Sequence, residues 1–312
     1  MKHILLTHYD LDGAACEIAF RMVFGDKVLA VSHGNHHEID RRFVAILDNP
    51  SLNPYNVEIW FADISPDRLI LERAIQEGYT VHLYDHHESA GWVKQVLPNS
   101  HFNPAMVECG ASLLFKDIVK QNPPPMVAPI ERFIEKVRSW DTWDWWNKND
   151  QMAKRLVTLF FILGYEYFVH FYLHRFQTME KDDGFIIIPA HDLFIDSRIH
   201  NQQEVIESIT PEKVITRNIC GYRGAVLFTG IGFSFSDGSS QFLRRFPEYD
   251  VMININLGMK TISYRTMKNN VDLSMIAKKM GGGGHKKSAG SPVPFEVMDT
   301  ITDAILMKIL GG

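Results

Sequence analysis

Short apolar stretches alternate with longer amphipathic stretches along the first 120 residues. Apolar runs rich in β-branched and aromatic residues predict strands, whereas apolar positions spaced three or four apart predict helices. The expected strands are residues 4–7, 28–32, 57–62 and 79–84, and the expected helices are 14–24, 38–47, 65–76 and 110–120. Strands that alternate with helices indicate a parallel sheet with helices on its faces.

In the rest of the chain, the sequence pattern changes near Lys213 from helices alone to strands mixed with helices. Before this point the pattern predicts helices at 127–139, one or two helices within 152–176, and a helix at 191–208. After it, we expect strands at 214–218, 225–229, 251–257 and 260–265, and helices at 237–246, 271–279 and 295–310. The predicted fold class is therefore α/β, with a parallel-sheet N-terminal domain (1–190), a helical linker (191–212) and a smaller α/β C-terminal domain (213–312).

Length and composition agree with two domains. The chain has 312 residues, 46% hydrophobic and 22% charged, which is ordinary for a globular protein of this size. The sequence contains no apolar run of about 18 residues and no signal-peptide pattern, so we expect no membrane partner. Three widely spaced cysteines (Cys16, Cys109 and Cys220) indicate reduced thiols and a cytoplasmic location.

The net charge of −5 bears on the ligand. Proteins that hold long nucleic acid without sequence preference usually present a basic face, which these totals do not indicate. A small or short anionic substrate, held by a few local cations, is compatible with the composition.

Ionisable residues gather where the predicted strands end. His8, Asp10 and Asp12 follow the first strand, Asp63 follows the third, and Asp85-His86-His87 follows the fourth. The carboxyl ends of parallel strands share one edge of the sheet, and ligands bind at that edge. For Asp12, a helix N-cap is the alternative interpretation.

These carboxylates predict a metal site. Asp10, Asp12, Asp63, Asp85 and Asp141 cannot share one pocket as five bare anions, because like charges drive protonation or open the site. Carboxylate and imidazole donors without thiolate favour manganese or magnesium over structural zinc. So many acidic ligands favour two ions, and two ions about 3.5–4 Å apart suit phosphoester hydrolysis.

A glycine run near the C-terminus predicts a phosphate site. Gly281 to Gly284 would expose backbone N–H groups, and His285 follows directly. The alternative is a flexible disordered loop. Arg265 ends a predicted strand just upstream and can hold an anion in a bidentate manner, which favours phosphate binding.

Four tryptophans surround Asp141: Trp140, Trp143, Trp145 and Trp146. Such a cluster is either core packing or a platform on which nucleobases stack, at about 1–3 kcal/mol per base. Trp143 is the stacking candidate.

Taken in order, Asp10-x-Asp12-Gly, Asp63, Asp85-His86-His87 and Asp141 resemble the four motifs of the DHH phosphoesterases. The segment from about Tyr222 onward, with Ser263-Tyr264-Arg265 and Gly281 to His285, is similar to the companion DHHA1 domain. The resemblance is nearest to the nanoRNase (oligoribonuclease) and RecJ-like branch, whose members degrade short RNA or linear dinucleotides with manganese.

The resemblance implies a role for each motif. Asp10, Asp12, Asp63, His86 and Asp141 would hold two metal ions, with Asp63 between them. Asp85 would be a ligand or would orient a histidine, and His87 would meet the scissile phosphate as a donor or general acid.

The same resemblance assigns Arg265 and His285 to the substrate phosphate, beside the predicted cradle of Gly282, Gly283 and Gly284. One position departs from the family pattern. Many members carry a metal-binding histidine four residues before the Asp-x-Asp motif, where this chain has Leu6. His8 either replaces that ligand or lies in the outer shell.

We therefore expect a manganese-dependent phosphodiesterase with two ions, magnesium being the alternative. It would hydrolyse short single-stranded RNA or linear dinucleotides to mononucleotides. Cyclic dinucleotides and 3′-phosphoadenosine 5′-phosphate (pAp) are alternative substrates, and a non-catalytic nucleotide-binding regulator is the alternative of another class. Cleavage polarity, RNA over DNA preference and oligomeric state, including a homodimer, stay open.

Overall fold

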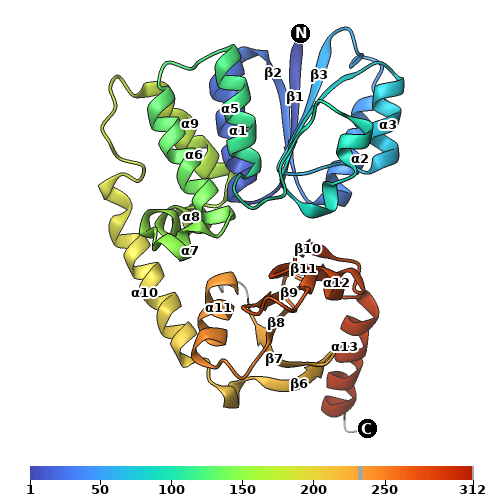
Figure 1. Ribbon diagram of the computed structural model, residues 1–312, viewed down its shortest axis with the longest axis vertical. Helices are drawn as coiled ribbons and strands as arrows, with labels where there is room; N and C mark the ends of the chain where they lie inside the picture. Colours follow the sequence, from blue (N-terminus) through green and yellow to red (C-terminus); the bar gives the residue numbers. More distant parts are fainter. Residues whose placement is uncertain (231–234, 311–312) are drawn as a thin grey trace. The chain divides into compact units, whose positions relative to one another are not determined.

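The computed structural model describes residues 1–230 and 235–310. The chain divides into two compact units, residues 1–197 and 198–312, and each contains its own sheet (Figure 1). Helix α10 (Asp192–Ser208) crosses the division between them. The predicted domain boundaries at residues 190 and 212 stay predictions.

The first unit contains a parallel sheet, as the alternating pattern predicted. Its strands are β1 (Lys2–Thr7), β2 (Val28–His33), β3 (Val57–Ala62), β4 (Thr80–Asp85) and β5 (His101–Phe102). They lie in the order β2-β1-β3-β4-β5, and all four neighbouring pairs are parallel. Only β5 was missed, because two residues carry no periodicity.

Helices cover both faces of this sheet. Helices α2 (His36–Leu47) and α3 (Arg68–Gln76) lie on one face, and α1 (Leu11–Phe24) and α5 (Gly110–Gln121) lie on the other (Figure 1). Phe61 packs among residues of α2 and α3, whereas the neighbouring Trp60 contacts Phe20 of α1. Burial on both faces explains why the central strands β1 and β3 are largely apolar.

A helical layer completes the first unit. It contains α6 (Val127–Asp141), α7 (Asp144–Lys148), α8 (Gln151–Leu163) and α9 (Tyr165–Thr178). The short helix α4 (Val93–Val96) instead packs Val93 into the core with α2 and α3. The apolar stretch 152–176 forms two helices because Gly164 takes a φ of 73° and ends α8. Within the described residues, no single helix is long and apolar enough to cross a membrane; α8 and α9 reach that length only as a pair bent by 117°.

The second unit is a six-stranded mixed sheet, which confirms the predicted second α/β region. Its strands are β6 (Ile215–Ile219), β7 (Tyr222–Thr229), β8 (Val251–Asn256), β9 (Thr261–Thr266), β10 (Gly283–His285) and β11 (Ser288–Pro292), in the order β10-β11-β9-β8-β7-β6. Helix α11 (Phe235–Arg245) packs Phe242 against one face. Helix α12 (Leu273–Lys278) packs Leu273 against the other, and α13 (Phe295–Leu310) ends the described chain.

The glycine-rich segment forms a β-hairpin and not a loop. Strands β10 and β11 pair antiparallel across it, so the alternative of a flexible disordered loop is wrong. A Cβ on Gly282 would lie 2.0 Å from the carbonyl oxygen of Gly290, and Gly284 has a φ of 126°. Two of the glycines are therefore required by the close approach and by the backbone conformation of the hairpin.

We expect Gly282→Ala to disrupt this hairpin. The added methyl group would overlap backbone atoms, and overpacking of this kind costs about 1–3 kcal/mol. Hydrogen exchange of the β10 and β11 amides in the full chain measures the loss of protection. Gly283→Ala is the matched control, because its Cβ meets no atom within 4 Å. Equal protection in both variants would contradict the steric explanation.

Candidate metal centre

The direction of the strand order reverses between β1 and β3. After β1 the chain moves to β2 on one side of the sheet, and it later returns to form β3 on the other side. Loops that leave neighbouring strands in opposite directions open a binding crevice at the carboxyl edge. Thr7 is paired with Ala62, and Ala62 with Tyr84, so His8, Asp63 and Asp85 begin at the same level.

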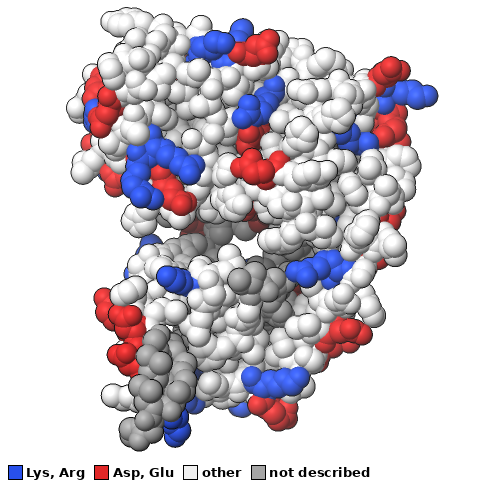
Figure 2. Space-filling view, turned by 180° about the vertical axis from the view of Figure 1, so that it is seen from behind, with Lys and Arg blue, Asp and Glu red and all other residues white. Residues whose placement is uncertain are grey.

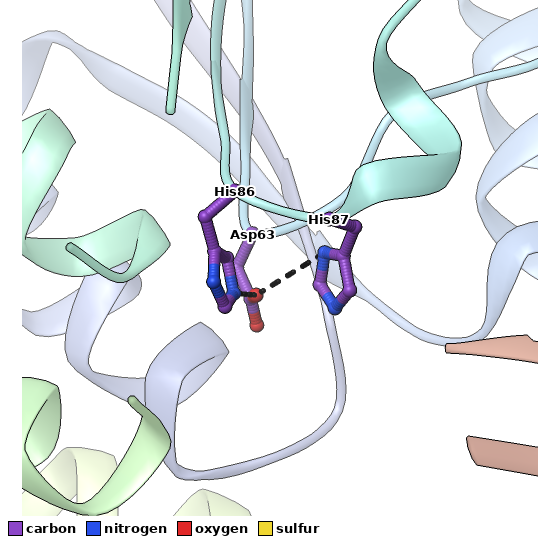
Figure 3. A group of neighbouring side chains, drawn as sticks. All are labelled: Asp63, His86 and His87. Atoms are coloured by element: carbon purple, nitrogen blue, oxygen red, sulfur yellow. Dashed lines mark hydrogen bonds and ion pairs between the residues drawn. The ribbon is translucent and has the colours of Figure 1, made fainter. Parts of the chain in front are cut away.

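Seven of the predicted residues converge at this edge. Three sets place their ligand atoms within 4.8 Å of one another: Asp63 with His86 and His87, His8 with Asp10 and Asp63, and Asp12 with His86 and Asp141. Asp63 and His86 each belong to two of these sets. Figure 3 shows the Asp63 carboxylate reaching toward the rings of both His86 and His87.

Asp63 is held in an unusual backbone conformation. Its φ is 61°, a left-handed value that non-glycine residues rarely adopt, and its N–H donates to the carbonyl of Tyr84 at 2.9 Å. The backbone of Gly110 lies against it so closely that a Cβ there would be 2.6 Å from the Asp63 Cα. Gly110 is thus required by the position of Asp63.

Asp12 is held by the first turn of helix α5. The N–H groups of Gly110 and Ala111 donate to its two carboxylate oxygens at 2.7 and 2.9 Å. The residue that caps α1 is Asp10, which accepts from the N–H of Gly13 at 2.9 Å, so the interpretation of Asp12 as an N-cap is wrong. The sequence carries no signal for the role of α5, because about a hundred residues separate the partners.

Asp85 lies behind the cluster and positions His87. Its carboxylate accepts from the Ser65 hydroxyl at 2.5 Å and from the amides of His86 and His87 at 2.7 and 3.0 Å. The Nδ1 atom of His87 lies 2.8 Å from the same carboxylate. Asp85 belongs to none of the three sets. Sequence reasoning missed Ser65, which follows Asp63 without any motif of its own.

His36 is a further residue near this network. It begins the first turn of α2, and its Nδ1 lies 3.2 Å from the carbonyl oxygen of Ser65. Burial lowers the pKa of His36, and the charges of His87 and His8 lower it further.

Protonation follows burial and pairing. Although burial opposes ionisation, the charge and hydrogen bond of His8 hold the pKa of Asp10 well below its usual range. His87 does the same for Asp85 and, through Asp85, has its own pKa raised to about 9. His8 beside Asp10 likewise has a raised pKa.

The other carboxylates behave in the opposite way. Burial and the charge of Asp141 raise the pKa of Asp12 to about 6, and burial with the charge of Asp10 raises that of Asp141 to about 7. Burial and the surrounding carboxylates raise the pKa of Asp63 well above its usual range. The protein alone therefore does not neutralise this cluster at neutral pH.

The donor atoms fit a divalent cation. Within the described residues, the buried Oδ2 atoms of Asp63 and Asp141 accept no hydrogen bond. All ligand atoms in the three sets are carboxylate oxygens or imidazole nitrogens. Oxygen and imidazole donors suit manganese and magnesium, and unsatisfied buried oxygens are what a cation would complete.

The residues predicted to hold phosphate lie together in the second unit. Arg265 on β9 is paired with Ser288 on β11, which is paired with His285 on β10, so the three form one row across the sheet. Arg265 is only 6% exposed, its Nε donates to the Ser240 hydroxyl at 3.1 Å, and burial lowers its pKa to about 10. Its guanidinium therefore stays charged at neutral pH.

The tryptophans pack largely on one another. Trp140 stacks on Trp145 with ring centroids 4.8 Å apart, and Trp143 stacks on Trp146 at 5.8 Å. Trp145 is buried, while the other three are partly exposed. Core packing therefore accounts for Trp145, and nucleobase stacking on Trp143 stays a prediction.

Known proteins resemble this chain along most of its length. No protein-family model matches it. It is 24% identical over 301 residues to oligoribonuclease NrnB of Bacillus subtilis (strain 168), an alignment that covers 95% of this chain and 74% of that protein.

Two solved structures are similar. RecJ from Thermus thermophilus, crystallised with Mn2+, superposes with a TM-score of 0.55 at 12% identity and covers 97% of this chain and 51% of its own. An uncharacterized protein from Helicobacter pylori G27 gives a TM-score of 0.51 at 16% identity and covers 95% and 94%. Together with the NrnB alignment, the RecJ-like fold supports the resemblance to the DHH and DHHA1 phosphoesterases.

We expect the metal-free chain to lose stability as the pH rises from about 4 to about 7. The pKa values of Asp12 and Asp141 in the folded chain, about 6 and about 7, exceed the value of about 3.9 for an unfolded aspartate. The folded chain then binds more protons in this window, so the free energy of unfolding falls with rising pH. Urea titrations across the window measure this slope.

A divalent cation requires ionised carboxylates, so Mn2+ should raise the unfolding temperature more at about pH 7.5 than at about pH 5. Asp141→Asn should flatten the slope of the metal-free chain, whereas Asp26→Asn, an exposed carboxylate of the same charge, should leave it unchanged. A free energy of unfolding that rises with pH in this window would contradict the assigned protonation.

Proposed function

We propose that this chain is a metal-dependent phosphodiesterase of the DHH type that hydrolyses short single-stranded oligonucleotides to mononucleotides. The observation that carries the proposal is the convergence of four carboxylates and three imidazoles at the switch point of the first sheet. Carboxylates held this close together repel one another, and bound cations would neutralise their charge.

The metal ligands in this proposal are Asp10, Asp12, Asp63, His86 and Asp141, with Asp63 shared between two manganese ions. The membership of Asp63 in two of the three sets supports the shared position. Bound ions of this kind supply Lewis-acid stabilisation of phosphoryl charge and lower the pKa of water.

His8 is proposed as the imidazole that replaces the family histidine absent at Leu6. Its Nδ1 lies 2.7 Å from Asp10 and 3.7 Å from Asp63. The ring therefore stands beside two of the proposed ligands, within reach of the same ion.

His87 is the proposed proton donor. Asp85 engages its Nδ1, so Nε2 is the atom proposed to meet the substrate. A pKa of about 9 keeps the ring protonated at neutral pH. It can then give a proton to the departing oxygen as the phosphodiester bond breaks, and Asp85 stabilises the imidazolium before transfer.

The row formed by Arg265 and His285, with Gly282, Gly283 and Gly284 of the hairpin, is proposed to bind the phosphate of the terminal nucleotide. The guanidinium has the planar geometry for two parallel hydrogen bonds to a phosphate. Trp143 is proposed to stack on a nucleobase.

The choice of substrate has two supports. The relative named an oligoribonuclease aligns along nearly the whole chain. On the face shown in Figure 2, basic and acidic side chains are intermixed and form no continuous basic tract, which suits a short substrate held by few cations. The free cysteines agree with a cytoplasmic enzyme.

A homodimer is compatible with this proposal.

We expect Asp63→Asn and His86→Ala to abolish Mn2+-dependent hydrolysis, because each removes a ligand that two of the sets share. The measurement is mononucleotide release from linear dinucleotides, longer RNA, cyclic dinucleotides and pAp, with Mn2+ or Mg2+. Asp26→Asn serves as the charge-matched control and should keep full activity.

Turnover restricted to cyclic dinucleotides or pAp would replace the substrate and keep the chemistry. Tight binding of these nucleotides by the wild-type chain without any turnover would overturn the proposed activity in favour of a non-catalytic regulator.

A further inference from the structure

Tyr9 occupies a position that the metal site does not explain. It lies between His8 and Asp10, whose side chains belong to one of the converging sets. Tyr9 itself is 57% exposed. The ring is thus presented at the surface within one residue of two proposed metal ligands.

The orientation of this ring is fixed from below. Tyr9 stacks on Tyr165 of α9 with centroids 5.0 Å apart and planes 12° apart. Tyr165 is only 2% exposed, and its hydroxyl donates to the Glu17 carboxylate at 3.3 Å. An exposed ring that rests on a buried, hydrogen-bonded ring loses little further freedom when a ligand binds to it.

His33 adds a second support. Its ring stacks on Tyr165 at 4.0 Å and lies 5.1 Å from the centroid of Tyr9. The Nε2 atom of His33 is 3.2 Å from the Glu166 carboxylate, which ties this ring to α9 as well. Three rings, from the turn after β1, from β2 and from α9, therefore build one platform, and Tyr9 is its most exposed member.

We propose that the exposed part of Tyr9 is a stacking surface for a nucleobase of the substrate. The inference rests on the proposed function, because it takes the scissile phosphate to lie at the metal centre beside His8 and Asp10. Consecutive Cα atoms are about 3.8 Å apart, so the backbone of Tyr9 is adjacent to both proposed ligands, and the proposal takes the nucleoside attached to that phosphate to reach the Tyr9 ring. Aromatic stacking is tolerant of base identity, which suits a hydrolase of mixed short sequences.

This platform differs from the tryptophan cluster. The rings of Trp140, Trp143, Trp145 and Trp146 contact one another on several sides. Tyr9 has ring partners only from Tyr165 and His33 among the described residues. Its role is to hold the nucleoside and not to transfer a proton, so it is a binding residue that sets KM.

The test compares Tyr9→Ala, Tyr9→Leu and Tyr9→Phe on a linear dinucleotide with Mn2+. Leucine keeps an apolar contact with Tyr165 without an aromatic face, which separates stacking from simple packing. We expect the alanine and leucine variants to raise KM about 5- to 150-fold with little change in kcat, and the phenylalanine variant to stay within about twofold of wild type. Tyr55→Ala, a more exposed tyrosine in the turn before β3, is the matched control and should keep the wild-type KM.

Dinucleotide analogues that lack one base identify the nucleoside that stacks. For the analogue without the stacked base, wild type and Tyr9→Ala should have the same KM; for the other analogue the difference should persist. An unchanged KM in Tyr9→Leu, or an equal loss on both analogues, would overturn the stacking role while leaving the phosphodiesterase intact. A wild-type chain that cleaves no oligonucleotide would overturn both proposals.

Discussion

Mutual repulsion among buried carboxylates is the constraint around which the first unit is arranged. Asp10, Asp12, Asp63 and Asp141 come from three different parts of the chain and lie close together, with Asp12 and Asp63 fully buried and the other two partly exposed. Neighbouring groups offset part of this repulsion or hold the carboxylates in place against it. The helix α5 amides hold Asp12, the His8 ring pairs with Asp10, and a left-handed backbone conformation keeps Asp63 in place. The remaining unfavourable charge is what a divalent cation would neutralise.

The same arrangement separates two kinds of carboxylate. Asp85 is saturated by hydrogen bonds from Ser65 and from two amides, and it serves as the fixed counter-charge of His87. Among the described residues, Asp63 and Asp141 each keep a buried oxygen that accepts no hydrogen bond. Identical side chains thus take opposite roles. The charge of His87 and hydrogen bonds lower the pKa of Asp85, whereas burial and neighbouring carboxylates raise those of Asp63 and Asp141.

Three glycines are required by the backbone geometry around them. Gly110 admits the backbone of Asp63, Gly282 admits the carbonyl of Gly290, and Gly284 takes a positive φ. Gly282 and Gly284 let β10 pair with β11, and this pairing places His285 in one row with Arg265. A motif that resembles a phosphate cradle in the sequence is therefore also a rigid strand pair, and rigid donors bind an anion at a lower entropic cost than a loop.

The sequence by itself determined the alternation of strands and helices, the parallel order of the first sheet and the set of ionisable residues at its edge. These follow from local patterns: periodicity marks each element, and parallel strands end on a common side. The resemblance to the DHHA1 domain led us to expect that Arg265 and His285 hold the same phosphate, and this stays a prediction. The sequence did not predict that the glycine run forms a β-hairpin or that Asp10 caps α1.

Tertiary structure alone decided how the site is supported. The amides of Gly110 and Ala111 reach Asp12 across about a hundred residues, and Tyr165 reaches Tyr9 across more than a hundred and fifty. No local pattern records such contacts, because they depend on how α5 and α9 pack against α1 and the sheet. The residues that could bind a metal are written in the motifs, but their protonation, their orientation and the exposed ring beside them are consequences of packing.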